Sequence, residues 1–264
     1  MDVSTTGDRR LVLTDDQKMK CIDLNCDLGE GCGNDAELMP LISSANIACG
    51  YHAGNIDTMK RTVDLAIEHG VAIGAHPGYP DRENFGRTSM NLSAEDTRDI
   101  IADQIRKLTD ITNTAGALVS HVKLHGALYN QSAKDAELAA VIAKTVHGID
   151  PELVLFGLSG SHSIREAKKV GLRTASEVFA DRTYQPDGSL TPRSQNNALI
   201  TDENSAVEQV LDMVKYGRVR STDAIMISIE AESVCIHGDG KRAVEFASLI
   251  RRRLDESGIL IKAI

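Results

Sequence analysis

The sequence predicts a single-domain α/β protein in which about seven parallel strands, each followed by a helix, close into a (β/α) barrel. Stretches with one apolar face at helical spacing alternate with short apolar stretches along the chain. Glycines stand where the helices should end. Two expected strands carry polar side chains on one face, which suits a barrel whose outward face packs on helices and whose inward face lines a mouth.

The N-terminal segment, 1–19, is charged and has no clear period, so we expect a flexible tail there and one barrel domain over 20–264. The first strand is expected over 21–27, where polar and apolar side chains alternate. Its inward face then carries Asp23, Asn25 and Asp27. A turn residue beside a glycine is the alternative interpretation of Asp27.

A helix is expected over 57–69, with Asp57 as its N-cap and Gly70 as its stop. The capping-box pattern that opens at Ser93 predicts the next long helix, which should end before Gly116. Further helices should stop at four glycines, namely Gly148, Gly171, Gly217 and Gly258. The remaining strands are expected over 45–48, 71–75, 119–125, 153–158, 172–179 and 234–237.

The strand expected over 119–125 is unusual because it places His121, Lys123 and His125 on one face. Burying two imidazoles and an ammonium requires partners, a ligand or a water-filled pocket. Any one of these histidines is more simply read as a hydrogen-bonded structural residue. The three together indicate a functional site at the carboxyl end of this strand.

Other polar residues also follow the carboxyl ends of expected strands, where the loops of a barrel converge on its active site. Arg182 and Asp239 are among these residues. We expect one end of the barrel to be ringed by Asp27, Glu30, His52, His76, Lys123, His125, Asp181 and His237. Two histidines, His69 and His147, precede helix-ending glycines, where a cation faces the negative end of the helix, so we interpret both as structural. For His162 both a structural and a functional role stay open.

Composition excludes several classes of function. A net charge of -9, no Trp and few aromatic residues argue against nucleic-acid binding. The five cysteines form no Cys-x-x-Cys pair and indicate reduced thiols of a cytoplasmic protein. Neither a membrane-spanning apolar run nor the apolar core of a signal peptide is present. The sequence also lacks the Gly-x-x-x-x-Gly-Lys-Ser/Thr loop of P-loop proteins.

Six blocks of sequence, in order along the chain, resemble the LamB/YcsF family. They read DLNCDLGE (23–30), SANIACGYHAG (44–54), GAHPGYPD with FGR (74–81 and 85–87), HVKLHGALYN (121–130), FADR (179–182) and HGD (237–239). Leu124 departs from the Pro typical of the family, and Thr88 stands where a second Arg is frequent. The resemblance implies a seven-stranded barrel akin to glycoside hydrolase and polysaccharide deacetylase barrels, which agrees with the strand count above.

The resemblance implies the A subunit of a 5-oxoprolinase, which opens the lactam of 5-oxo-L-proline to L-glutamate with ATP and partner subunits B and C. A lactam is a poor electrophile, so phosphorylation of its carbonyl oxygen followed by attack of water is a plausible route. That route needs positive charge and a base. As catalytic residues we expect Asp27, Glu30, Lys123 and His125. As substrate-binding residues we expect Asn25, His52, His76, Arg82, Arg87, Asp181, Arg182, His237 and Asp239. Arg193 is a further candidate for positive charge.

Two other functions stay open. One is a metal-dependent amide or N-acetyl hydrolase, for which the ligands would come from Asp27, His52, His121, His125 and His237. Against it, His121 and His125 would lie about 13 Å apart on a regular strand. The other is a non-catalytic protein that presents 5-oxoproline to a partner. ATP is the expected cofactor, with Mg²⁺ as its companion ion. A protein-bound metal and a homo-oligomer are left open.

Overall fold

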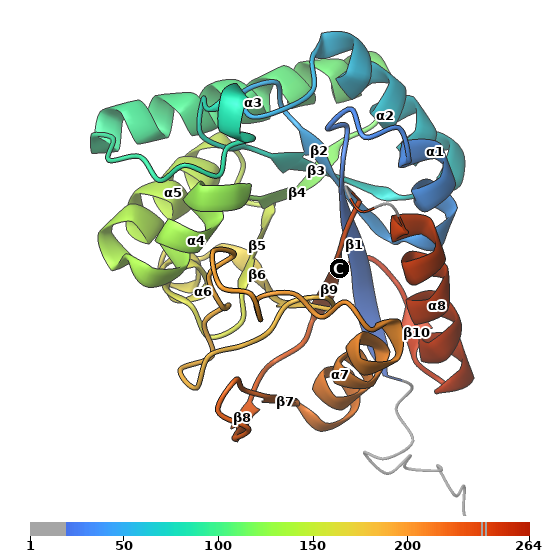
Figure 1. Cartoon of the computed structure of the whole chain (residues 1–264). Coiled ribbons are helices and arrows are strands. Elements are labelled where there is room, and N and C mark those ends of the chain that lie inside the picture. Colours follow the sequence, from blue (N-terminus) through green and yellow to red (C-terminus); the bar gives the residue numbers. More distant parts are fainter. Residues whose placement is uncertain (1–19, 239, 241) are drawn as a thin grey trace, which may run out of the picture.

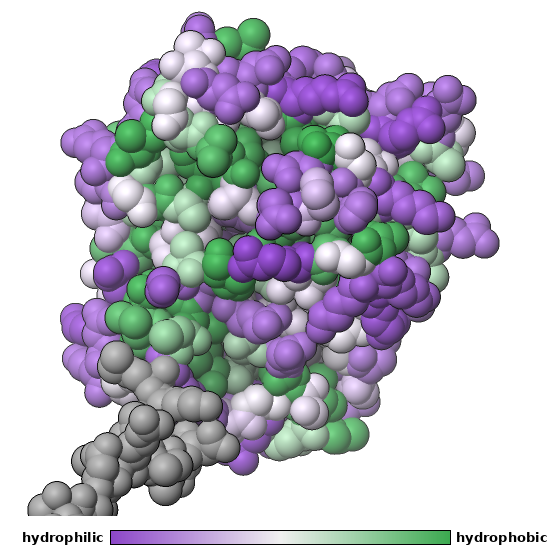
Figure 2. Space-filling model, turned by 180° about the vertical axis from the view of Figure 1, so that it is seen from behind, coloured by the Kyte–Doolittle hydropathy of each residue, from purple (hydrophilic) through white to green (hydrophobic). Residues whose placement is uncertain are grey.

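The computed structural model describes residues 20–238, 240 and 242–264 (Figure 1). The expected tail, 1–19, and the site candidate Asp239 therefore lie outside the described residues. None of the helices in the described part of the chain is long and apolar enough to cross a membrane. On the face shown in Figure 2, hydrophilic and hydrophobic residues are interspersed.

A closed barrel of seven parallel strands forms the centre of the molecule, as the sequence predicts. Each strand pairs with its neighbours in parallel, and the first strand pairs with both the second and the last, which closes the ring. In barrel order the strands are β1 (Cys21–Leu28), β2 (Ser44–Ala48), β3 (Ala72–His76), β4 (Val119–Lys123), β5 (Val154–Leu158), β6 (Arg173–Phe179) and β9 (Ser233–His237). The short strand β10 (Leu260–Ile261) pairs with the start of β1.

Helices surround the strands (Figure 1). They are α1 (Asp35–Leu38), α2 (Ile56–His69), α3 (Ala94–Thr114), α4 (Gly126–Lys134), α5 (Ala136–Ile149), α6 (His162–Lys169), α7 (Glu203–Tyr216) and α8 (Ala243–Glu256), with the 3-10 turns η2 (Met39–Leu41) and η3 (Arg82–Asn84). A separate antiparallel pair, β7 (Arg218–Arg220) and β8 (Met226–Ser228), follows α7. Apolar side chains of the strands and the helices pack together in one large core.

The helix boundaries test the predictions from capping residues. Ser93 caps α3 as predicted, because its side chain accepts a hydrogen bond from the Asp96 N–H. The cap of α2 is Asn55, whose side chain accepts from the Thr58 N–H, so the prediction of Asp57 as N-cap is wrong by two positions. The prediction that a helix stops at Gly148 is also wrong. Helix α5 continues to Ile149, and the Asp150 N–H still bonds to the Val146 carbonyl.

The barrel interior is polar, as the alternation in β1 predicts. Ile22, Leu24 and Cys26 belong to the outer core, whereas Asn25 bonds across the barrel. Its side-chain amide donates to Glu177 Oε1 at 2.9 Å and to Ser233 Oγ at 2.7 Å. Because these strands pair in register, one residue of slip would turn the polar face of β1 out into the apolar core.

Strand β4 differs from the prediction at its carboxyl end. It ends at Lys123, and His125 precedes helix α4, so the three polar residues do not share one strand face. The His125 N–H bonds to the Pro77 carbonyl, and the chain turns into the helix at Gly126, whose φ is 54°. Only His121 and Lys123 point inward from the strand. His121 does not line the cavity described below.

His121 instead packs inside the barrel. Its Nε2 lies 2.9 Å from Asn46 Oδ1 and its Nδ1 lies 2.9 Å from Ser120 Oγ. The ring stacks on Phe156 with 4.4 Å between centroids. A Cβ at Gly74 would overlap the imidazole, so a glycine is needed beside it. Burial, with a smaller effect of the charge on Lys123, lowers the pKa of His121 to about 3, which keeps the ring neutral.

The buried His121 predicts a pH dependence of stability. In the unfolded chain a histidine titrates near pH 6.5, so below about that pH the unfolded state binds a proton that the folded state excludes. The free energy of unfolding should therefore fall as the pH falls from about 6.5 towards 4, and His121 should contribute about 1.4 kcal/mol per pH unit to that slope. Denaturant unfolding, followed by far-UV circular dichroism, should show a shallower slope in His121→Gln. Parallel curves for the two proteins would contradict this assignment.

Candidate functional site

A cavity of about 470 Å³ opens at the carboxyl ends of the strands. Loops following β1, β3, β4, β6 and β9 supply its charged lining, which brings together residues far apart in the sequence. The cavity reaches seven of the predicted site residues, Asp27, Glu30, Arg87, Lys123, His125, Arg182 and His237, and also Tyr129, Phe179 and Arg193. The structure thus gathers these residues at one end of the barrel, where the predicted βα order places them.

Lys123 is the most buried charge of the cavity wall, with a relative exposure of 2%. Its Nζ lies 2.8 Å from Asp27 Oδ1 and 2.9 Å from Glu177 Oε1. Burial alone would lower the pKa of Lys123, but Asp27, Cys235 and Glu177 raise it well above the usual value. Lys123 is therefore an ammonium ion held between two carboxylates.

Asp27 is the counterpart of this ammonium. Burial tends to raise the pKa of Asp27, but His76 and Lys123 hold it well below the usual value, so the group is a carboxylate. Asn46 also donates to Asp27 Oδ1 at 2.9 Å. Burial of the Lys123 ammonium requires an anionic partner. The structure shows Asp27 in that place and Glu177 as the second partner.

Sequence reasoning missed three residues at this position. Glu177 is fully buried, and a carboxylate within an expected strand was the available signal. Cys235 was expected only as one of five reduced thiols, but its sulfur accepts a hydrogen bond from Lys123 Nζ at 2.9 Å. Tyr129 lines the cavity, and its hydroxyl has no hydrogen-bond partner among the described residues. The pattern of β9 contains nothing that distinguishes Cys235 from a packing residue.

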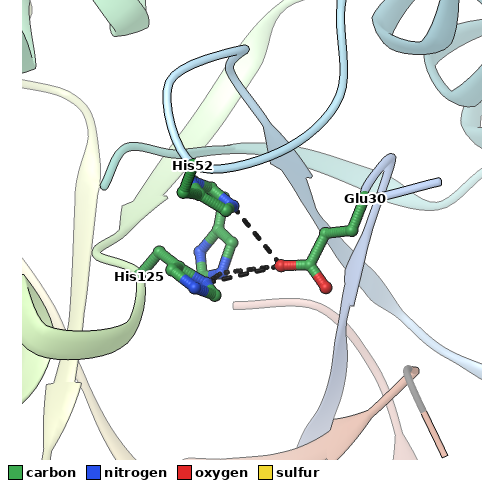
Figure 3. Close-up of side chains that lie close together, drawn as sticks. Glu30, His52 and His125 are labelled. Carbon is green, nitrogen blue, oxygen red and sulfur yellow. Dashed lines mark hydrogen bonds and ion pairs between the residues drawn. The ribbon is translucent and has the colours of Figure 1, made fainter. Parts of the chain in front are cut away.

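Beside Lys123, Glu30 and three histidines form a cluster (Figure 3). Glu30 follows β1, His52 lies in the loop after β2, His76 ends β3, and His125 precedes α4. Glu30 Oε1 lies 3.4 Å from His52 Nε2 and 3.4 Å from His125 Nδ1, and 3.9 Å from His76 Nε2. We call these four residues the Glu30 cluster.

Burial sets the charge of the cluster histidines. It lowers the pKa of His125 to about 3 and lowers the pKa of His52 even further, and the neighbouring histidines act in the same direction. Gly86, with a φ of 65°, lets the chain pass close to both rings. A Cβ at this glycine would lie 2.8 Å from His52 Cβ and 2.9 Å from His125 Cδ2. The two neutral rings stack with 3.8 Å between centroids.

His237, which also lines the cavity, is hydrogen-bonded to a carboxylate. His237 Nδ1 lies 2.9 Å from both oxygens of Asp181, so this nitrogen carries the proton that the carboxylate accepts. Arg193 Nη2 donates to His237 Nε2 at 3.0 Å, so the second nitrogen is unprotonated and its lone pair accepts this hydrogen bond. Burial tends to raise the pKa of Asp181, but His237 lowers it below the usual value. A carboxylate that orients an imidazole in this way prepares it to accept a proton.

The remaining candidates have other surroundings. Arg82 lies outside the cavity lining and donates to the carbonyls of Gly50 and Gly54, so it holds the loop that carries His52. Arg182 lines the cavity and donates to the Thr191 carbonyl at 2.6 Å, and burial lowers its pKa to about 10. Asn25 lies beneath the cavity floor. His162, for which the sequence left both roles open, begins α6 and is absent from the cavity lining.

Two groups of described residues have the composition of a metal site. One is the Glu30 cluster and the other comprises Asp27, Cys235 and His237, and within each group the ligand atoms lie within 4.8 Å of one another. The ligand set suggested by the sequence for a metal-dependent hydrolase belongs to neither group as a whole. His121 belongs to neither group. His76 belongs to the Glu30 cluster, although the sequence analysis did not propose it as a metal ligand.

The closed parallel barrel with its polar site at the carboxyl ends of the strands defines a deacetylase-like (β/α) barrel protein. A family 4 carbohydrate esterase from Streptomyces lividans shares this fold, with a TM-score of 0.50 and 13% identity over 93% of both chains. More specifically, the chain belongs to the LamB/YcsF family, whose model matches residues 22–264. The family resemblance seen in the sequence blocks is confirmed.

Two relatives are much more similar. The A subunit of the 5-oxoprolinase of Geobacillus kaustophilus (strain HTA426) is 54% identical over 249 residues, which cover 93% of this chain and 97% of that protein. The lactam utilization protein of Thermus thermophilus has a known crystal structure with 41% identity and a TM-score of 0.87. This similarity covers 92% of this chain and 100% of that one.

The environment of Lys123 predicts a large loss of stability in Lys123→Met. The substitution leaves Asp27 and Glu177 buried without their shared cation, which should lower the free energy of unfolding by about 3–5 kcal/mol. The second substitution Glu177→Gln removes one of the two carboxylates that Lys123→Met leaves without a cation. The double variant should therefore recover part of the lost free energy of unfolding. The exposed pair of Lys107 and Asp103 supplies the control, because Lys107→Met should cost less than about 1 kcal/mol. Unfolding curves of equal stability for Lys123→Met and Lys107→Met would contradict the paired-charge interpretation.

Proposed function

We propose that this chain is the A subunit of an ATP-dependent 5-oxoprolinase and opens the lactam of 5-oxo-L-proline to L-glutamate together with partner subunits B and C. The observation that carries the proposal is the 54% identity with the Geobacillus kaustophilus 5-oxoprolinase chain over nearly the whole of both proteins. The name lactam utilization protein of the Thermus thermophilus relative agrees with a cyclic-amide substrate.

The chemistry needs activation of the amide. Attack of the lactam oxygen on the γ-phosphorus of ATP releases ADP and makes the ring carbon electrophilic. One water then adds to that carbon, the C–N bond breaks, and the ring nitrogen leaves as the amine of γ-glutamyl phosphate. A second water releases inorganic phosphate and L-glutamate. This sequence requires cationic groups for the phosphoryl oxygens and the substrate carboxylate, and a base for each water.

The cavity has side chains suited to both roles. Lys123, Arg182 and Arg193 bring positive charge to its wall, as Arg87 does at its edge. His237, held by Asp181, has an unprotonated Nε2 and acts as the base for water in this proposal, which requires Arg193 to turn from Nε2 to an anionic group of the substrates. Asp27 and Lys123 act as one unit because they neutralise each other, so phosphate binding by Lys123 must compete with Asp27. ATP enters as cosubstrate of the assembled enzyme, with Mg²⁺ on its phosphates.

A second function has one observation in its favour. The Glu30 cluster brings three imidazoles and a carboxylate together beside the cavity, which is the ligand composition of a metal-dependent amide hydrolase. The two functions differ in their need for ATP. The purified chain should release glutamate from 5-oxoproline only when subunits B and C and ATP are present, with formation of inorganic phosphate. Glutamate release by the chain alone in a zinc-supplemented, ATP-free assay would instead support the hydrolase.

His237→Gln tests the proposed base. Loss of a general base should lower the rate of 5-oxoproline-dependent glutamate release by the assembled enzyme by about 10²–10⁴-fold. The thermal melt should remain close to that of the unmodified chain, because His237 is partly exposed at the cavity rim. His147→Gln, on the exposed surface of α5, is the matched control and should retain full activity. Full turnover in His237→Gln would remove this residue from the mechanism.

A further inference from the structure

We propose that the Glu30 cluster binds one divalent transition-metal ion of the zinc type, through Glu30, His52, His76 and His125. Metal binding here is separate from the proposed ring opening, because it is a property of four side chains in the isolated chain. It can therefore fail its test while the proposed function stands.

The first argument comes from the protons of His76 and His125. His76 Nδ1 lies 2.8 Å from the Lys123 carbonyl, and His125 Nε2 lies 2.8 Å from the Phe85 carbonyl. A carbonyl oxygen only accepts, so each of these nitrogens carries its ring's proton. The other nitrogens, His76 Nε2 and His125 Nδ1, then bear lone pairs, yet they face each other at 2.9 Å. Two lone pairs at this distance repel each other unless a cation lies between or beside them.

The second argument comes from His52. Its side chain is fully buried, and neither ring nitrogen has a hydrogen-bond partner among the described residues. A buried polar group without a partner is costly. A proton on His76 Nε2, facing both His125 Nδ1 and Asp27 Oδ2 at 3.4 Å, would remove the repulsion between those two rings. It would still leave His52 without a hydrogen bond among the described residues. A metal ion accepts lone pairs from all three rings at once.

The distances fit a tetrahedral ion. Two ligand atoms that each lie about 2.1 Å from such an ion are about 3.4 Å apart. Glu30 Oε1 is 3.4 Å from both His52 Nε2 and His125 Nδ1. Two further pairs lie on either side of this value, with 2.9 Å between His76 and His125 and 3.9 Å between His76 and Glu30. The ligand atoms of all four residues lie within 4.8 Å of one another. The His52 ring stacks on His125, so it must rotate to aim its lone pair, and this rotation breaks no hydrogen bond of the ring within the described part of the chain.

The surroundings also match what metal-binding histidines require. Ligand histidines usually donate their second N–H to a carbonyl or carboxylate, which fixes the ring and its tautomer. His76 and His125 both do so through the Lys123 and Phe85 carbonyls. Three imidazoles and one carboxylate favour zinc, cobalt, manganese or iron over magnesium, which prefers oxygen ligands. Because Glu30 and His125 line the cavity, the ion would border on the space where a substrate binds.

Metal titration tests the proposal directly. The chain is stripped with a chelator, dialysed and titrated with Zn²⁺ and Co²⁺ by calorimetry, and we expect one ion per chain. Bound Co²⁺ should give visible ligand-field bands without the near-ultraviolet charge-transfer band of a thiolate ligand. Cys21→Ser/Cys32→Ser serves as the background, since both of these thiols are exposed. Zn²⁺ should also raise the melting temperature of this background protein.

Two cluster variants and one control complete the test. His52→Gln and His76→Gln should each weaken Zn²⁺ binding by more than the roughly 10–100-fold that loss of an outer-shell partner costs. His69→Gln, at the exposed end of α2, should bind as the background does. Circular dichroism establishes that each variant is folded. Absence of stoichiometric binding, binding unchanged in both cluster variants, or a thiolate band that assigns the ion to Cys235 would each overturn the proposal.

Discussion

The buried ammonium of Lys123 is the interaction on which the rest of the site depends. An isolated charge inside a protein costs several kcal/mol of desolvation, so Lys123 is stable there only because Asp27 and Glu177 approach it within 2.9 Å. These carboxylates come from two different strands, and the lysine comes from a third. The triad of Lys123, Asp27 and Glu177 can therefore form only in the closed barrel. It also requires the strands to keep one register.

The register of the strands also positions the neighbours of Asp27. Pairing of β1 with β2 sets Asp27 beside Asn46, and pairing of β1 with β9 sets it beside His237. The side-chain amide of Asn46 donates to both Asn25 and Asp27, and its Oδ1 faces the His121 ring. The polar interior is thus one connected set of hydrogen bonds from the middle of the barrel to the cavity floor. Such a network is stabilising only when its members are satisfied together, which ties the shape of the cavity to the barrel core.

The periodicity of the sequence was sufficient to predict the barrel and the end at which its polar residues gather. Alternation in β1 and the order of strands and helices carry that information locally. Contacts across the barrel are not encoded in this way. Cys235 has the sequence appearance of a packing residue, and only its position opposite Lys123, 112 residues away, makes its thiol a hydrogen-bond acceptor. Arg82 was predicted to contact substrate because of its charge, but two loop carbonyls accept its donors.

The pairing of β1 with β9 has a consequence for the order in which the molecule can form. The last barrel strand to be synthesised is β9, and Asp27 meets His237 only across the seam between β1 and β9. Cys235 and Ser233, which contact Lys123 and Asn25, arrive on the same late strand. A nascent chain that lacks β9 holds the first six strands with an open edge on each side and with its charged interior exposed to water. The cavity therefore cannot be complete until the final strand is in place.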